Sequence, residues 1–353
     1  MAESAAEPLL ELEGITYRYP VRDGMRFWKR KKGAGVHQVN LSLEAGDIVG
    51  LIGPNGGGKT TLLHTIAGLW KPDSGSFRVL GRDAQEAGRR WVQRHIGFMP
   101  EQVVWTGSST PRQVLERLIT MRGGDDDAIK MLRLVGLRSR ADSPLDSLSQ
   151  GMEQRMTLAT ALLGEPTILL LDEPMNGLDP VAQAAFRGLL RQLADRGCAI
   201  IVSSHNLNEM ERVVDRVAIM NRGQLVASGP MADVERRLAL EQRLLLAGSG
   251  PKPDLSLLTS EGVIIEEQET RSVEEDWRYR LIRRAGRWEP GDRGLLTAAV
   301  EAAGGVVQLI HPLPAALEDL LGAVTGQDPE KVGLELEGDE LVPMRTLEVD
   351  DDE

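Results

Sequence analysis

The chain has 353 residues, which exceeds the usual size of one domain and predicts about two or three of them. Its formal net charge is -12, and this acidic balance argues against a protein that follows nucleic-acid phosphates with a basic face. The single cysteine, Cys198, excludes an internal disulfide and fits a buried thiol in a reducing compartment.

The first predicted element is a strand over Leu9–Tyr19, where apolar and polar residues alternate. A loop is expected from Val21 to Gly35. It contains the basic and aromatic run 26–32, which is either a solvated loop or a basic patch that Trp28 anchors at lipid headgroups. The loop is the favoured interpretation, because so short a mixed run is weak evidence for a surface site.

The clearest motif follows a short apolar strand, Ile48–Ile52, and precedes an apolar helix, Leu62–Leu69. The intervening residues have the spacing G-x-x-x-x-G-K-T of a P-loop, whose glycine backbone N–H groups wrap a phosphate at a helix N-terminus. Lys59 would reach the outer phosphates, and the Thr60 hydroxyl would face magnesium. The alternative is a glycine-rich turn before an ordinary helix, but it does not explain the lysine and the hydroxyls. The predicted phosphate-binding residues are Gly53, Pro54, Asn55, Gly56, Gly57, Gly58, Lys59, Thr60 and Thr61.

Helices and short strands alternate after the P-loop. Thr110, Pro111 and Gln113 predict a capping box at the start of a helix that reaches Met121. Other helices are expected at 128–135, 153–163, 187–194 and 230–240, and strands at 76–80, 96–99, 167–171, 199–202, 217–220 and 224–227.

Two adjacent carboxylates follow the apolar strand Thr167–Leu171. From the end of such a buried strand Asp172 can hold magnesium beside the P-loop, and Glu173 would then face an attacking water. The alternative for Glu173 is a solvent-facing carboxylate at a strand end. An acidic pair before a proline, after so apolar a strand, favours the role in hydrolysis.

The composition changes after about residue 240. Strands and helices are expected in the order β-α-β-β-α-β from Gln242 to His311, which is a split βαβ layout. Trp277, Trp288 and His311 are interpreted as structural. Residues 326–353 contain eleven acidic and two basic residues, and this charge predicts a disordered tail.

Together, these motifs resemble the ordered set found in ABC-type ATPases. The set comprises the P-loop, Gln102 after a strand, Leu148–Met152, Leu170–Pro174, Gly177–Pro180 and Ser203–His205. The resemblance covers residues 9–240. It implies a P-loop ABC ATPase domain of the α/β class, with a RecA-like core, an antiparallel β subdomain and a helical subdomain at about 103–165. The small α+β domain at 241–326 and the tail at 327–353 would follow.

The resemblance also assigns roles in ATP and magnesium binding. Tyr19 would stack on adenine, Lys59 and Thr61 would hold phosphates, and Thr60, Gln102 and Asp172 would hold Mg²⁺. Glu173, Gln102 and His205 form the implied catalytic group. Glu173 would polarise water, and His205 would contact the γ-phosphate.

Three further residues would act on the ATP of a second subunit. By resemblance, Ser149, Gly151 and Asp179 lie at the interface of a dimer, expected to be a homodimer, that closes around two ATP molecules. Ser149 could alternatively cap only its own helix, and the two roles are compatible.

The chain departs from the commonest family signature at Gln150 and Met152. A methionine at that place, together with the segment 314–326, resembles the exporter group of antibiotic-resistance and ABC-2-type ATPases. This implies an ATPase subunit that drives a separately encoded membrane permease. The sequence has no secretory signal pattern and no apolar run near the roughly 18 residues of a membrane helix. We therefore expect a cytoplasmic protein at the inner face of the membrane. The alternative is a soluble ABC-type ATPase acting on nucleic acid or ribosomes.

Overall fold

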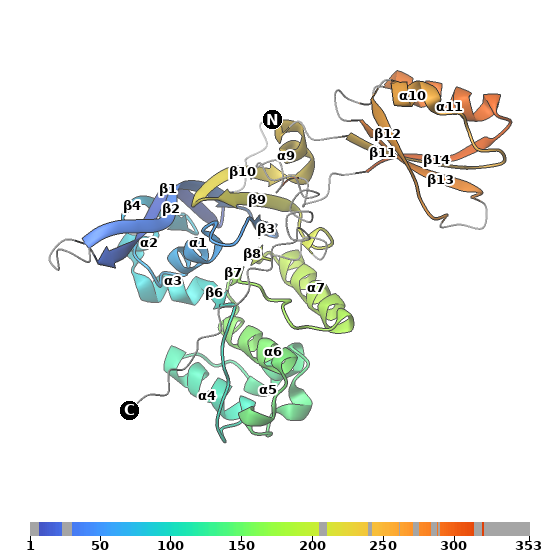
Figure 1. Ribbon diagram of the computed structural model, residues 1–353. Coiled ribbons are helices and arrows are strands. Elements are labelled where there is room, and N and C mark those ends of the chain that lie inside the picture. Colours follow the sequence, from blue (N-terminus) through green and yellow to red (C-terminus); the bar gives the residue numbers. More distant parts are fainter. Residues whose placement is uncertain are drawn as a thin grey trace, which may run out of the picture.

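The computed structural model describes residues 7–22, 30–204, 210–238, 242–260, 262–270, 275–283, 288, 290–313 and 320. These residues form one six-stranded and two four-stranded sheets with helices packed on them (Figure 1). The sequence-based expectation of an α/β fold is confirmed, because the six-stranded sheet is mostly parallel and is accompanied by helices.

The six-stranded sheet carries the strands that lead into the predicted site. Its order is β10-β9-β3-β8-β7-β6, parallel from β9 to β6, with β10 antiparallel at one edge. Because β3, β7 and β8 are buried along their whole length, they are apolar runs rather than alternating patterns. Their carboxyl ends lie at one edge of the sheet. The strands are β3 (Ile48–Ile52), β6 (Ile96–Met99), β7 (Ile168–Leu171), β8 (Ala199–Ser203), β9 (Arg216–Asn221) and β10 (Gln224–Pro230).

An antiparallel sheet of order β2-β1-β4-β5 shares a hydrophobic core with one face of the central sheet and with α1. The prediction of a loop from Val21 to Gly35 is wrong in extent, because β1 continues to Arg22 and pairs there with Arg30 of β2. An antiparallel ribbon can face water, so its charged composition does not exclude strands. Residues 23–29, Trp28 included, lie outside the described residues. The elements are β1 (Leu10–Arg22), β2 (Arg30–Leu43), α1 (Lys59–Ile66), β4 (Ser74–Val79), β5 (Arg82–Asp83), α2 (Ala84–Ala87) and α3 (Arg89–His95).

A helical region follows β6 and shares a core with the other face of the central sheet. The predicted capping box is confirmed: the Thr110 hydroxyl accepts the Gln113 N–H at 3.3 Å, and Gln113 Oε1 accepts the Thr110 N–H at 3.1 Å. The elements are α4 (Pro111–Arg122), α5 (Ala128–Leu134), the short 3₁₀ turns η1 (Arg138–Arg140) and η2 (Leu145–Ser147), and α6 (Gln150–Ala161).

Two helices begin earlier than the sequence pattern predicts. α6 starts at Gln150 rather than Glu153, and α7 (Pro180–Asp195) starts at Pro180 rather than Arg187. Apolar periodicity is weak in these first turns. Pro180 occupies the first helical position, where its missing N–H costs nothing, and Asp179 caps the helix by accepting the Ala182 N–H at 2.8 Å.

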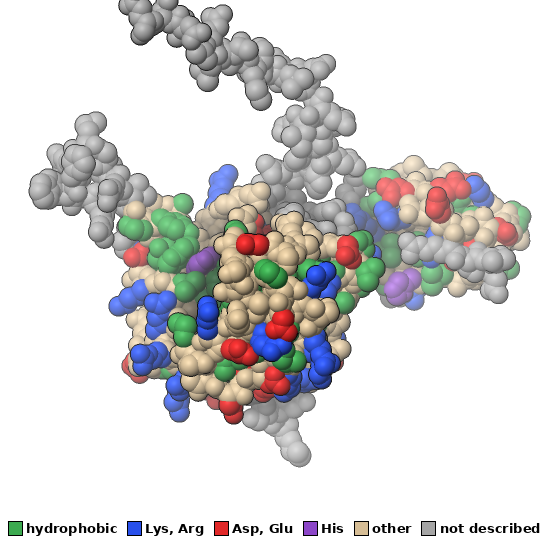
Figure 2. All heavy atoms as spheres, turned by 90° about the horizontal axis from the view of Figure 1, so that it is seen from below, with side chains coloured by type: hydrophobic (Ala, Val, Ile, Leu, Met, Phe, Trp, Pro, Cys, Tyr) green, Lys and Arg blue, Asp and Glu red, His purple; other side chains and the backbone are tan. Residues whose placement is uncertain are grey.

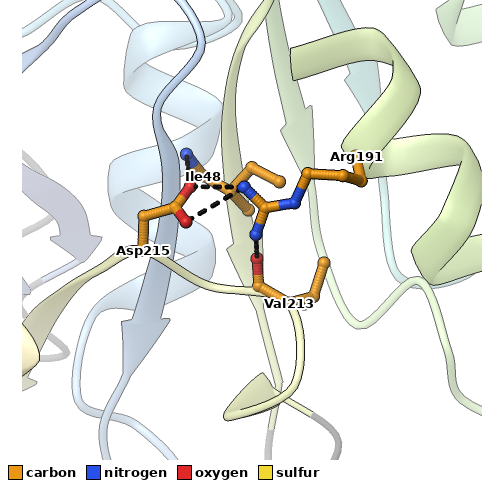
Figure 3. Close-up of polar contacts among 4 residues, drawn as sticks. All are labelled: Ile48, Arg191, Val213 and Asp215. Atoms are coloured by element: carbon orange, nitrogen blue, oxygen red, sulfur yellow. Dashed lines mark hydrogen bonds and ion pairs between the residues drawn. The ribbon is translucent and has the colours of Figure 1, made fainter. Parts of the chain in front are cut away.

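A polar cluster fastens α7 to the start of β3 and to the segment before β9 (Figure 3). Arg191 donates to both carboxylate oxygens of Asp215 at 3.0 Å and to the Val213 carbonyl oxygen at 2.9 Å. The Ile48 N–H donates to Asp215 Oδ2 at 3.3 Å, and the Asp215 N–H donates to the Ile48 carbonyl oxygen at 2.9 Å. This cluster therefore fixes the origin of the strand that ends at the P-loop.

The third sheet, of order β12-β13-β11-β14, forms a separate lobe in Figure 1. The predicted β-α-β-β-α-β order is confirmed, and Trp277 is buried in this lobe's own core, as expected. The preceding helix is α9 (Met231–Leu238), and the lobe comprises β11 (Gln242–Ser249), α10 (Ser256–Ser260), β12 (Val263–Glu267), β13 (Trp277–Arg283), α11 (Pro290–Ala302) and β14 (Val306–Leu313). The exact division of the chain into domains stays a prediction.

No helix within the described ranges is both long and apolar enough to cross a membrane. Three further expectations, besides that for Trp28, fall on residues outside the described ranges: most of the helix near 315–324, the acidic tail 327–353, and His205.

Candidate functional site

The P-loop lies between β3 and α1, and its glycines are required by close backbone approaches. A Cβ on Gly53, whose φ is +156°, would stand 2.2 Å from the Met220 carbonyl oxygen. Gly58, with φ +105°, is the N-cap residue of α1, and a Cβ there would lie 3.1 Å from Gly223 Cα in the β9–β10 turn. The Gly223 N–H also donates to the Gly57 carbonyl oxygen at 2.8 Å. The loop is thus held against the sheet, and the N-terminal end of α1 faces the site.

Lys59 is buried at the start of α1, with 8% of its surface exposed. Its ammonium group donates to the Gly53 carbonyl oxygen at 2.7 Å and to that of Pro54 at 3.3 Å. Burial lowers the pKa of Lys59, while the negative charges of Glu173, Asp172 and Glu101 oppose that shift. The cation is therefore fixed at the loop and faces several acidic groups.

Tyr19 connects the antiparallel sheet to the P-loop helix. Its hydroxyl lies 3.1 Å from Thr61 Oγ1, and the Tyr19 side chain is 37% exposed. The ring packs edge-on against Tyr17 and Trp70, with centroid separations of 5.4 and 5.2 Å. An exposed aromatic face held in this way can stack on a planar ring.

Asp172 and Glu173 follow β7 and are both buried, with exposed fractions of 1% and 8%. The Ser203 hydroxyl, at the end of the neighbouring β8, donates to Asp172 Oδ1 at 2.5 Å and accepts the Glu173 N–H at 3.0 Å. Asp172 Oδ2 is buried and has no hydrogen-bond partner within the described part of the chain. Glu173 has φ +49°, a left-handed conformation that costs a non-glycine residue about 1–3 kcal/mol and is typical of functional sites.

These elements surround one pocket of about 600 Å³, a size suited to a small-molecule ligand. It brings together Tyr19, Lys59, Asp172 and Glu173, which lie far apart in the sequence. Its walls are formed by Tyr19, Ala34, Gly35, Asn55, Gly56, Gly57, Gly58, Lys59, Thr60, Thr61, Glu101, Asp172 and Glu173.

The comparisons with known proteins agree with this geometry. A family model described as "ABC transporter" matches residues 36–176. The Nod factor export ATP-binding protein I of Burkholderia lata is 34% identical over 224 residues, which are 62% of this chain and 72% of that protein. The chain belongs to the family of ABC transporter ATP-binding proteins.

Other similar proteins include an import protein and a solved dimeric structure. The zinc import ATP-binding protein ZnuC of Pseudomonas fluorescens is 41% identical over 186 residues, 52% of this chain and 67% of that protein. A solved dimeric structure of a bacterial ABC transporter cassette is 26% identical with a TM-score of 0.55, covering 63% of this chain and 98% of that one. The matched region spans 60% and 37% of the length of two other curated relatives.

Several residues predicted for the site lie away from the pocket wall. Gln102 is exposed, and its neighbour Glu101 lines the pocket instead. Ser149, Gly151 and Asp179 do not line it either. His205 lies outside the described residues, so its placement stays a prediction.

Ser149 is exposed at the N-cap of α6, and in the described structure its side chain makes no capping hydrogen bond. The alternative that Ser149 only caps its own helix is therefore not supported. Asp179, in contrast, does cap α7 through its side chain. Its second role, at an interface, stays a prediction.

The residues of the pocket fit a magnesium ion. Asp172 Oδ2 is a buried carboxylate oxygen without a hydrogen-bond partner among the described residues, which suits a hard cation. Thr60 offers a hydroxyl on the same wall. Three acidic side chains would repel a triphosphate in this pocket unless a divalent cation lay between them.

Sequence reasoning missed two residues of the site. Glu101 was overlooked beside Gln102, and Ser203 was recognised only as part of a motif. The available signal for Ser203 was its position, since it is the first hydroxyl after the apolar run Ala199–Val202 and ends a buried strand.

Proposed function

We propose that this ABC ATPase binds Mg²⁺ and ATP in the pocket, hydrolyses the ATP, and works as a dimer that drives a separate membrane permease. The observation that carries the proposal is the convergence of Lys59, Asp172 and Glu173 on one pocket from β3–α1 and from the end of β7. Phosphoryl transfer to water requires a cation, a metal-binding carboxylate and a base beside the P-loop, and these three residues supply those groups.

Each residue has a chemical task in this proposal. The backbone N–H groups of 56–59 and the Lys59 ammonium bind the phosphates, while Tyr19 stacks on adenine. Thr60 and Asp172 would hold Mg²⁺, with Gln102 as the third predicted ligand. A bound Mg²⁺ neutralises charge on the outer phosphates.

Glu173 is the proposed general base. It is buried beside Asp172, and its backbone is held in a left-handed conformation that directs its side chain. By resemblance, His205 contacts the γ-phosphate and helps to align the attacking water.

The dimer is supported by what lies outside the pocket. Ser149 presents a hydroxyl that its own helix does not use, at the N-terminus of the twelve-residue helix α6. Such an end attracts anions, and the phosphates of a second subunit would satisfy it. Gly151 and Asp179 would lie at the same interface, and a homodimer supplies two complete sites.

Transport through a permease, and export in particular, is the finer part of the proposal. Relatives include a Nod factor export protein, a probable multidrug transporter protein and a zinc import protein. Met152 and the segment 314–326 favour the exporter group. The permease would select the cargo. Binding to the permease would hold this chain at the inner face of the membrane.

The rival function is an ABC-type ATPase that acts on nucleic acid or ribosomes. In Figure 2, basic and acidic side chains are interspersed over the described part of the face shown, rather than gathered in one basic stripe. A nucleic-acid track would need clustered Lys and Arg. This observation favours the permease-coupled function.

The decisive test uses the variant Glu173→Gln. We expect it to keep ATP affinity within about threefold of wild type and to lower kcat by at least about 100-fold, because the amide is not a base. It should also accumulate as an ATP-bound dimer in size-exclusion chromatography. Unchanged hydrolysis would remove Glu173 from the base role.

The matched control is Glu116→Gln, an exposed carboxylate on α4. It should retain wild-type turnover and remain monomeric under the same conditions. Co-purification of the full chain with a polytopic membrane protein would support the transport function. Salt-sensitive binding to nucleic acid would instead support the rival.

A further inference from the structure

We infer that Ser203 is a positioning residue for magnesium binding and hydrolysis, because its one hydroxyl orients Asp172 and holds the backbone of Glu173. This inference rests on the proposed ATPase function and extends it to a residue that does not line the pocket. Ser203 ends β8 and is completely buried.

The hydrogen bonds define what the hydroxyl does. Ser203 Oγ donates its proton to Asp172 Oδ1 at 2.5 Å, and one of its lone pairs accepts the Glu173 N–H at 3.0 Å. A serine hydroxyl has one donor and two acceptor positions, so a single side chain can serve both neighbours. Alanine could serve neither.

The first bond determines which oxygen of Asp172 remains available. Oδ1 is engaged by Ser203, whereas Oδ2 is buried with no hydrogen-bond partner in the described chain. The carboxylate plane is therefore fixed, and its free oxygen is the one that can serve a cation. Loss of a partner that orients a metal ligand commonly lowers metal affinity or activity by about 10-fold to 100-fold.

The second bond acts on Glu173. This residue adopts φ +49°, which a non-glycine residue maintains only when its surroundings hold it there. The bond from its N–H to Ser203 Oγ is one such restraint and links the end of β7 to the end of β8. Loss of the bond would let the backbone relax and redirect the proposed base.

The test compares wild type with Ser203→Ala. The affinity for ATPγS is measured by calorimetry in EDTA and again with Mg²⁺, and kcat is measured for ATP. In EDTA we expect the variant's Kd to stay within about twofold of wild type, because the P-loop is intact. With Mg²⁺ the gain in affinity should fall by about tenfold or more, and kcat should fall by about 10-fold to 100-fold.

The matched control is Thr157→Ala. Thr157 is also a buried hydroxyl with two hydrogen bonds, accepting from Trp105 Nε1 and donating to the Glu153 carbonyl oxygen, both at 2.9 Å. It lies on α6, away from the pocket walls. Its loss should lower the melting temperature without changing the gain in affinity that Mg²⁺ provides.

Should Ser203→Ala fail to fold, Ser203→Cys replaces it, since a thiol of similar shape is a weaker donor and acceptor and should show the same pattern to a smaller degree. A Mg²⁺ effect and kcat within about twofold of wild type would overturn the inference. So would an equal loss of affinity in EDTA and in Mg²⁺, which indicates only a damaged fold. If wild type itself neither gains affinity with Mg²⁺ nor hydrolyses ATP, the proposed function fails instead.

Discussion

Arg191 and Asp215 form an ion pair with a bifurcated hydrogen bond, in which one guanidinium nitrogen donates to both carboxylate oxygens at 3.0 Å (Figure 3). Both side chains are more than 40% exposed, so the charge attraction alone contributes little. The same carboxylate also accepts the Ile48 N–H at 3.3 Å. Asp215 therefore joins three segments, namely α7, the start of β3 and the segment before β9.

We predict that Asp215→Ala lowers the free energy of unfolding by about 1–2 kcal/mol, because a backbone donor and a guanidinium lose their acceptor together. Chemical denaturation measures this change. The matched control is Asp142→Ala, which removes a surface ion pair with Arg112. Its effect should stay below about 0.5 kcal/mol, and equal losses in both variants would contradict the linking role of Asp215.

Lys59→Ala should weaken ATP binding by at least about tenfold, because it removes the buried positive charge of the P-loop. Fluorescence of a labelled ATP analogue provides the dissociation constant. The control is Lys130→Ala, an exposed lysine of α5 that should bind ATP normally. An unaltered dissociation constant in Lys59→Ala would count against the phosphate assignment.

Ser149→Ala should leave the melting temperature unchanged, since the Ser149 hydroxyl makes no capping bond within the described structure. ATP hydrolysis should nevertheless fall by about tenfold or more, because the hydroxyl is proposed to contact phosphate in the opposing subunit. Thermal unfolding and steady-state ATPase assays are measured together.

Thr110→Ala is the reciprocal control for Ser149. Its hydroxyl does cap a helix, α4, so the change should cost about 0.5–2 kcal/mol of stability and leave hydrolysis intact. The intersubunit role of Ser149 is contradicted if Ser149→Ala lowers stability to the same extent and spares the ATPase activity.

Cys198 is half-buried rather than fully buried as expected, and it should still react slowly in the folded protein, because this partial burial raises the pKa of its thiol from 9.0 to about 12. At pH 8 the thiolate fraction, and with it the alkylation rate, should be roughly 1000-fold smaller than in the unfolded chain. Iodoacetamide labelling with and without urea measures the ratio, with Cys198→Ser as the blank. Similar rates in the two conditions would show that the thiol is not protected.

The same shift has a consequence for stability. The folded pKa lies above the unfolded value, so the folded state retains the proton longer than the unfolded state. The contribution of the protonated Cys198 thiol to the free energy of unfolding is therefore complete below about pH 9. It is lost as the pH rises toward about 12. Cys198→Ser should flatten this part of the stability curve.

Local pattern was sufficient for much of the fold. The glycine and lysine spacing of the P-loop, the apolar strands 48–52 and 168–171 and the capping box at Thr110 were all predictable, because each depends on residues adjacent in sequence. The β-α-β-β-α-β order of the third sheet was predictable for the same reason. Helix starts were less so, since the first turns of α6 and α7 carry caps and polar residues rather than an apolar stripe.

The length of the β1–β2 ribbon was mispredicted, because charged residues are compatible with an antiparallel hairpin as well as with a loop. The left-handed backbone of Glu173 left no trace in the sequence. Such a conformation is imposed by packing and hydrogen bonds rather than by residue preference.

The sequence by itself determined which chemical groups this ABC transporter ATP-binding protein carries and on which elements they lie, because motif spacing and periodicity are properties of neighbouring residues. Only the tertiary structure decided how those groups meet. β8 pairs with β7, so Ser203 reaches Asp172, and the end of β1 lies beside α1, so Tyr19 reaches Thr61. These contacts join residues 31 and 42 positions apart, and they depend on strand order and side-chain packing that no local pattern contains.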